Sequence, residues 1–202
     1  VDEKDPHALP NMDFKIMQGN SLLEQYEGVE LSGMSIDEQK KRKTKKGQLW
    51  QATLAFDEKY ALDNIQRAIK EYYLTNDYNS KLSLRSIINE NVRNYIINLK
   101  GCTPDVKSKI EKLTIPNDKF FLWHIYFKEV FDNGGFDIVI GNPPYVLVQT
   151  FHDRDLEAMY KKTYSVASYK VDLYHLFIEL GYNIIKENGI LTYINPTNYL
   201  TN

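Results

Sequence analysis

The stretch FDIVIGNPPYV, residues 136–146, constrains the fold more than any other part of the sequence. Its first six residues, 136–141, are almost continuously apolar and rich in β-branched side chains, a pattern typical of a strand in a parallel sheet covered on both faces. Two consecutive prolines follow, and each removes a backbone N–H and restricts the residue before it to extended geometry. The stretch therefore predicts a buried strand that leads directly into a rigid loop.

Two further segments are predicted to be strands, DFKIMQG at 13–19 and GILTYIN at 189–195. Between the second and third strands, apolar residues recur at helical spacing over 168–186, and Asn188-Gly189 predicts the end of that helix. Another helix is expected between residues 118 and 131, with its aromatic side chains packed on the sheet. Strands that alternate with helices in this way indicate an α/β fold.

Residues 32–116 differ in character, because they are rich in Lys, Glu, Gln, Asn and Tyr and show helical periodicity over 49–74 and 84–99. They predict a helical insertion (32–116) between two parts of an α/β core, residues 9–31 and 117–202. The basic block KKRKTKK within the insertion has two open interpretations, a solvated surface or a patch that contacts phosphates.

Composition narrows the class of protein. The 202 residues carry a formal net charge of -2 and are 43% hydrophobic, which is typical of a globular protein. No apolar run approaches the roughly 18 residues that span a membrane, and no signal peptide is recognised, so a cytoplasmic location is expected. The single cysteine, Cys102, excludes an internal disulfide framework, and the four histidines lack metal-ligand spacing, so no metal is assigned.

The loop at Asn142-Pro143-Pro144-Tyr145 is expected where parallel α/β sheets bind ligands, beyond the carboxyl end of a strand. Its prolines leave carbonyl oxygens and the Asn142 side chain as hydrogen-bond acceptors. Such acceptors suit an amino group on an aromatic ring, because they hold both hydrogens and stabilise the positive charge that develops when the nitrogen is alkylated. Tyr145 offers a ring on which a planar substrate can stack. A simple turn after a strand is the open alternative.

These residues resemble a known family. GNPPY is similar to the motif of N6-adenine DNA methyltransferases of the gamma arrangement, as found in type IIG restriction–modification enzymes and phage-defence methyltransferases. LPNMDFKIMQGNSLLE (9–24) and KVDLYHLFIELGYNIIKENGILTYINPTNYL (170–200) resemble segments that flank this motif in those proteins. The resemblance implies a partial Rossmann-like S-adenosylmethionine methyltransferase sheet, with three strands present and a long α-helical insertion.

The resemblance also implies residue roles. Asn142, Pro143 and Tyr145 match the residues that hold and stack the target adenine, and Pro144 lies in the same substrate-binding loop. The partner would be double-stranded DNA, from which the adenine is flipped out of the stack.

Three other residues are assigned in the same way. Asp172 and Tyr174 match the start of the helix that flanks the target-base pocket, with a packing role as the alternative. Asn20 matches a residue that hydrogen-bonds the adenine of the cofactor, S-adenosylmethionine, with a helix-capping or turn role as the alternative.

The family's glycine-rich cofactor turn, its ribose-binding acidic residue and its target-recognition region have no match in these residues. We therefore expect a fragment that is inactive alone, with sheet edges through which two chains could pair. Two other functions stay open: a methyltransferase that modifies RNA or protein glutamine with the same loop, and a non-catalytic helical DNA-binding module formed by residues 32–116.

Overall fold

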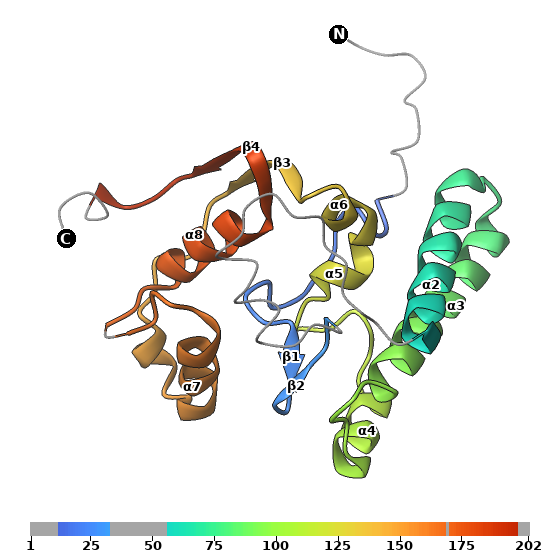
Figure 1. Ribbon diagram of the computed structural model, residues 1–202, viewed down its shortest axis with the longest axis horizontal. Coiled ribbons are helices and arrows are strands. Elements are labelled where there is room, and N and C mark those ends of the chain that lie inside the picture. The colour runs from blue at the N-terminus through green and yellow to red at the C-terminus, as the bar shows by residue number, and fades with distance from the viewer. Residues whose placement is uncertain (1–11, 33–55, 169, 198–202) are drawn as a thin grey trace, which may run out of the picture.

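The computed structural model describes residues 12–32, 56–168 and 170–197 (Figure 1). Helices α2–α4 lie on one side of the molecule, and α7, α8, β3 and β4 lie on the other. The elements follow one another as β1 (Gln25–Tyr26), β2 (Val29–Glu30), α2 (Phe56–Leu74), α3 (Tyr78–Ile97), α4 (Pro104–Glu111), α5 (Trp123–Tyr126), α6 (Lys128–Asp132), β3 (Phe136–Gly141), the 3₁₀ helix η1 (Val148–Phe151), α7 (Arg154–Thr163), α8 (Leu173–Ile184) and β4 (Ile185–Tyr193).

The segments predicted to be helical within residues 49–99 largely coincide with α2 and α3, which pack against each other. Both α3 and α4 begin at side-chain caps, because Asp77 accepts a hydrogen bond from the Ser80 N–H and Thr103 accepts one from the Val106 N–H. The basic block at residues 40–46 lies outside the described residues.

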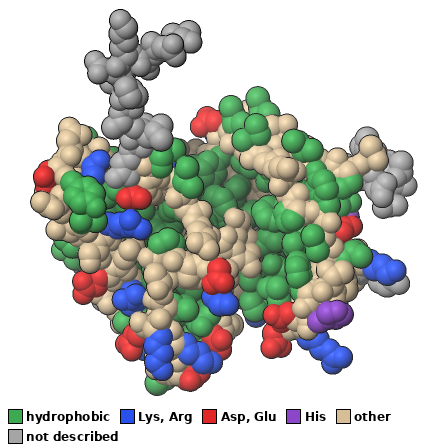
Figure 2. Space-filling view, turned by 180° about the vertical axis from the view of Figure 1, so that it is seen from behind, with side chains coloured by type: hydrophobic (Ala, Val, Ile, Leu, Met, Phe, Trp, Pro, Cys, Tyr) green, Lys and Arg blue, Asp and Glu red, His purple; other side chains and the backbone are tan. Residues whose placement is uncertain are grey.

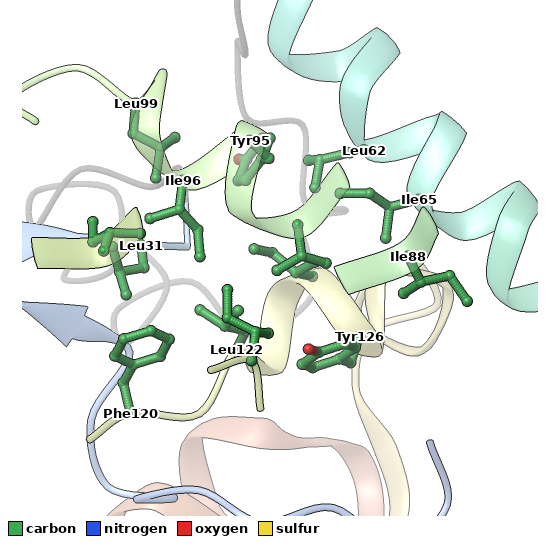
Figure 3. Packing of buried hydrophobic residues seen from close by; sticks show 14 of the residues in the cluster. Leu31, Leu62, Ile65, Ile88, Tyr95, Ile96, Leu99, Phe120, Leu122 and Tyr126 are labelled. Carbon is green, nitrogen blue, oxygen red and sulfur yellow. The ribbon is translucent and has the colours of Figure 1, made fainter. Parts of the chain in front are cut away.

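A large apolar cluster, here called the helical core, joins α2, α3, α4 and α5 to the segment before α5 (Figure 3). Its members are spaced three and four residues apart along the helices, as an amphipathic pattern requires. The labelled side chains in Figure 3 converge from several elements: Leu31, Leu62, Ile65, Ile88, Tyr95, Ile96, Leu99, Phe120, Leu122 and Tyr126. This part of the chain therefore buries its own hydrophobic surface.

Strands β3 and β4 form a parallel pair in which Ile138 is opposite Ile190 and Gly141 is opposite Tyr193. The prediction of a strand at 136–141 is confirmed. The strand predicted at 189–195 starts earlier, at Ile185, because α8 ends at Ile184. Asn188-Gly189 consequently lies inside β4, in an irregular stretch where Asn188 has a φ of 63°, and does not end the helix.

The strand predicted at 13–19 is wrong. Residues 13–15 form a turn in which the Met12 carbonyl accepts hydrogen bonds from the N–H groups of Lys15 and Ile16, and Phe14 has a φ of 59°. The alternation of apolar residues was misleading because the Phe14 ring packs against Tyr72, with ring centroids 5.1 Å apart, beside the helical core. The short antiparallel hairpin β1–β2 follows instead.

Among the described residues, the parallel sheet therefore has two strands, and the expected three-stranded sheet is not observed. The expectation that both faces are covered is also wrong, because Ile138, Ile140 and Ile190 are 59%, 77% and 61% exposed. Hydrophobic side chains are visible over a broad area of the face shown in Figure 2.

The segment predicted as one helix over 118–131 forms two short helices, α5 and α6, which meet at Phe127. Its aromatic side chains pack on the sheet as expected, because Trp123, Phe127 and Phe131 all make edge-to-face contacts with Phe136 of β3. In the described parts of the chain, a search for helices with the length and apolar character needed to cross a membrane finds none.

Candidate functional site

The loop after β3 is tied to the start of α8 by backbone hydrogen bonds. Leu147 pairs with Asp172 in an antiparallel bridge, and the Val148 N–H donates to the Val171 carbonyl at 2.9 Å. The Leu173 N–H donates to the Val146 carbonyl, also at 2.9 Å. These bonds fix the downstream end of the loop at residues 142–145, here called the NPPY loop, against the start of α8.

Tyr145 fastens the same loop to the end of β4. Its hydroxyl donates to the Ile194 carbonyl at 2.5 Å and lies 3.3 Å from the Asn142 side-chain oxygen Oδ1. The Ile194 N–H in turn donates to the Gly141 carbonyl at 3.2 Å. These hydrogen bonds join the carboxyl ends of β3 and β4 to each other and to the NPPY loop.

This loop is rich in hydrogen-bond acceptors and poor in donors. Asn142 and Pro144 are exposed and Pro143 is buried, and neither proline has an N–H to donate. We call the Asn142 side-chain oxygen and the Pro143 carbonyl the acceptor edge. The loop begins where β3 passes close to β4, since a Cβ on Gly141 would lie 3.0 Å from the Tyr193 ring.

Tyr145 presents an aromatic surface beside the acceptor edge. The side chain is 47% exposed, and its ring meets the buried Tyr174 ring edge to face, with centroids 6.1 Å apart at 87°. Tyr174 also contacts the His175 ring, at 4.1 Å. Asp172 is the N-cap residue of α8, but its side chain makes no capping hydrogen bond. The structure therefore brings Asn142, Tyr145, Asp172 and Tyr174 to one end of the sheet.

Asn20 lies in a different contact group. Its side-chain oxygen accepts a hydrogen bond from the Leu22 N–H at 3.2 Å, and its side-chain nitrogen donates to the Tyr160 hydroxyl at 3.3 Å. Burial raises the pKa of Tyr160, while the bond from Asn20 lowers it. The turn role of Asn20 is therefore observed, and its role toward a cofactor stays a prediction.

Asn20 adjoins a second apolar cluster, here called the α8 cluster, which packs α7 and α8 onto the residues that follow Asn20. The Tyr164 hydroxyl donates to the Leu22 carbonyl at 2.7 Å within it. Its buried members are Leu22, Leu23, Val148, Tyr160, Tyr164, Ala167, Val171, Leu173 and Leu176. The cluster links the Asn20 turn to η1 and to the start of α8, which flank the NPPY loop.

Sequence reasoning missed Ile194 and Asn195. The backbone of Ile194 anchors Tyr145, and the buried side-chain oxygen of Asn195 has no hydrogen-bond partner among the residues that the structure describes. A signal for the second residue exists in the sequence, because Asn195-Pro196 follows β4 much as Asn142-Pro143 follows β3. In a parallel pair, both dipeptides come to the same edge of the sheet.

Glu179 was missed as well. Its carboxylate accepts hydrogen bonds from the Ser165 and Val166 N–H groups, each at 3.0 Å, and only 9% of the residue is exposed. The available signal was the single acidic residue in the mostly apolar stretch LYHLFIELGYNI. Glu179 therefore fixes the turn between α7 and α8.

The chain matches both a family model and individual known proteins. The family model described as Eco57I restriction-modification methylase matches residues 29–202. The Type II restriction enzyme and methyltransferase RM.Eco57I of Escherichia coli is 38% identical over 71 residues, covering 34% of this chain and 7% of the relative. The Type II methyltransferase M.TthHB8I of Thermus thermophilus is 35% identical over 71 residues, covering 32% of this chain and 17% of the relative.

A third relative, the Type II methyltransferase M.BstVI of Geobacillus stearothermophilus, is 32% identical over 99 residues, covering 49% of this chain and 17% of the relative. No solved structure matches the chain. The aligned part of the chain spans less than a fifth of the length of each of these relatives. The family model nevertheless covers all but the first 28 residues, and the chain therefore belongs to the Eco57I restriction-modification methylase family.

Proposed function

We propose that the intact protein is a site-specific DNA methyltransferase that transfers a methyl group from S-adenosylmethionine to N6 of a flipped adenine. The acceptor edge carries this proposal, because the exposed residue Asn142 has its side-chain oxygen 3.3 Å from the hydroxyl of half-exposed Tyr145, with Pro143 next in the chain, in a protein of this family. The activity is proposed for the intact protein, since the chain aligns with only 7–17% of its relatives' length.

The acceptor edge acts on the amino group that is to be methylated. An exocyclic amine is a weak nucleophile because its lone pair is delocalised into the ring. Asn142 Oδ1 and the Pro143 carbonyl would accept the two N6 hydrogens, which favours tetrahedral nitrogen and stabilises the positive charge that develops as N6 bonds to the methyl carbon. The bond from that carbon to sulfur would break, its electron pair staying on sulfur, and one N6 proton would then pass to water. S-adenosylmethionine supplies the electrophilic methyl group when it is bound.

The surrounding residues would hold the base. Reaching N6 requires the adenine to leave the duplex, at a cost of a few kcal/mol. Stacking on Tyr145 offsets about 1–3 kcal/mol of that cost. Pro144 would border the base from the loop, and Asp172 and Tyr174 would border it from the start of α8.

The polar groups of Asn20 fit one part of the cofactor. The Asn20 amide uses one lone pair for Leu22 and one N–H for Tyr160, so one lone pair and one N–H stay available. That donor–acceptor pair fits the edge of the cofactor's adenine, which offers an amino group beside a ring nitrogen. Asn20 would therefore hold the adenine end of S-adenosylmethionine.

One amide is a small part of a cofactor site. We therefore propose that residues 1–202 alone bind S-adenosylmethionine weakly or not at all and do not methylate DNA. Calorimetric titration of this chain with the cofactor tests the point, and tight binding would refute it.

The substrate is tested with the intact protein and cofactor labelled in its methyl group. Duplex DNA, RNA and a mixture of proteins are offered in turn, and the modified residue is identified by mass spectrometry. We expect N6-methyladenine in DNA at one recognition sequence. Label in RNA or in glutamine side chains, with DNA unmodified, would contradict the proposal. We place the reaction in restriction–modification of the type IIG kind or in phage defence, because RM.Eco57I combines a restriction enzyme with a methyltransferase.

A further inference from the structure

The Tyr145 hydroxyl faces two acceptors but has only one hydrogen to donate. It lies 2.5 Å from the Ile194 carbonyl and 3.3 Å from Asn142 Oδ1. Hydroxyl hydrogen bonds have typical oxygen–oxygen distances of about 2.7–2.8 Å, so the hydrogen belongs to the short contact. The longer contact then places two oxygens against each other with no hydrogen between them.

We propose that the Asn142 carboxamide is turned by 180°, so that its nitrogen faces the Tyr145 hydroxyl oxygen. An Asn142 N–H then donates to Tyr145, and the Tyr145 O–H donates to the Ile194 carbonyl. This rotation exchanges the positions of the side-chain oxygen and nitrogen of Asn142, which are nearly equal in size, and moves no other group. It replaces an oxygen–oxygen contact by a hydrogen bond and directs Asn142 Oδ1 away from Tyr145.

The far end of this hydrogen-bond chain is fixed by the sheet. The Ile194 N–H donates to the Gly141 carbonyl at 3.2 Å, directly after the pair formed by Gly141 and Tyr193. The Tyr145 ring is in turn held edge to face against buried Tyr174. The hydroxyl therefore has a defined position from which to orient the exposed Asn142 side chain.

The consequence concerns substrate recognition and rests on the proposed function. An unrestrained exposed carboxamide presents either its oxygen or its NH₂ group to the solvent. Only the oxygen can accept from the amino group of the target base, whereas the NH₂ group would place donor against donor. Tyr145 thus serves as a positioning residue through its hydroxyl, in addition to the stacking surface of its ring.

Replacement of Tyr145 by phenylalanine in the intact protein separates these two roles. The ring stays, so base stacking and the KM for DNA should change little. The orienting hydrogen bond is lost, so kcat should fall about 3- to 10-fold, the loss expected for one neutral hydrogen bond. Tyr78→Phe is the matched control, because Tyr78 is 72% exposed at the start of α3. An unchanged kcat in Tyr145→Phe, or a raised KM with unchanged kcat, would overturn the inference.

A second measurement does not depend on activity. In the 202-residue chain labelled with ¹⁵N-asparagine, the side-chain resonances of Asn142 are assigned by their disappearance in Asn142→Ala. We expect one Asn142 side-chain proton to exchange with solvent more slowly in the wild-type chain than in Tyr145→Phe. Equal exchange in both would refute the hydrogen-bond chain. If the intact protein methylates no DNA, the proposed function fails, and this exchange measurement still decides the orientation of Asn142.

Discussion

Isoleucine side chains are buried in the helical core but exposed on one face of the β3–β4 sheet. Ile88 and Ile96 of α3 are completely buried, whereas Ile140 of β3 and Ile190 of β4 are 77% and 61% exposed. The helical core therefore buries its own hydrophobic side chains, while the sheet leaves one apolar face exposed to solvent. The large buried cluster and the candidate site therefore lie in different parts of the molecule, because the site is at the end of the sparsely covered sheet.

The largest effect is expected in the helical core. Ile88→Ala should lower the free energy of unfolding by about 2–5 kcal/mol, because it removes buried methyl groups and leaves a cavity. The adjacent Ile87 is 46% exposed, and Ile87→Ala should cost about 0.5 kcal/mol or less. Urea unfolding of both variants measures the difference. Equal losses would mean that Ile88 is not packed in the helical core while Ile87 is exposed.

The second largest effect is expected at Glu179, which joins α8 to the turn after α7, beside the α8 cluster. Glu179→Ala leaves the Ser165 and Val166 N–H groups without their acceptor and should cost about 2–3 kcal/mol in unfolding free energy. Glu179→Gln retains one of the two oxygens and should cost less. A loss as large for the glutamine variant as for the alanine variant would argue against these two hydrogen bonds.

Two buried tyrosines sharpen the comparison further. The Tyr164 hydroxyl donates to the Leu22 carbonyl in the α8 cluster, whereas the Tyr126 hydroxyl in the helical core is buried and has no hydrogen-bond partner within the described parts of the chain. Tyr164→Phe should therefore lower the unfolding free energy by about 1 kcal/mol at neutral pH. Tyr126→Phe should be neutral or stabilising. The opposite ranking in urea unfolding would contradict the assigned hydrogen bonds.

Alkaline pH gives an independent test of the same pair. Burial raises the pKa of both Tyr126 and Tyr164 above that of an unfolded tyrosine, about 10. Below pH 10 both states keep the protons, so these groups cause no pH dependence. Above it, the unfolded chain loses protons first, and the unfolding free energy falls by up to about 1.4 kcal/mol per pH unit for each tyrosine. Tyr126→Phe should reduce this slope, and an unchanged slope would exclude Tyr126 as a cause.

The smallest effect is expected on the open face of the sheet. Ile140→Thr keeps a β-branched side chain in β3 and exposes little that was buried, so its unfolding free energy should change by no more than about 0.5 kcal/mol. A loss of several kcal/mol would show that this face is covered in solution.

Sequence patterns succeeded where local chemistry decides the structure. An apolar β-branched run that stops at two prolines has few alternatives, and β3 matches its predicted bounds, 136–141. Tertiary packing decided the failures. Phe14 lies in a strand-like sequence pattern, but its ring packs against Tyr72 and the segment forms a turn. The end of α8 is set by the pairing of Ile185 with Phe136 instead of by Asn188-Gly189.

The candidate site shows the same limit. The position of Asn142 and Tyr145 after a strand follows from the order of residues in the chain. The bond from Tyr145 to the Ile194 carbonyl does not, because it depends on the parallel register of β3 and β4 and joins residues 49 positions apart. The burial of the Asn195 side-chain oxygen depends on the same pairing of β3 with β4 and is not readable from the local sequence.

The most direct test of the proposed chemistry is the Asn142→Ala variant of the intact protein, assayed for N6-methyladenine in duplex DNA. Asn98→Ala is the control, because the exposed Asn98 side chain donates to the Asn94 carbonyl at the end of α3, away from the NPPY loop. We predict that Asn142→Ala lowers kcat by about 100-fold or more with DNA binding retained, as for other preorganised groups that stabilise charge in a transition state. Adenine methylation at the wild-type rate would contradict the account.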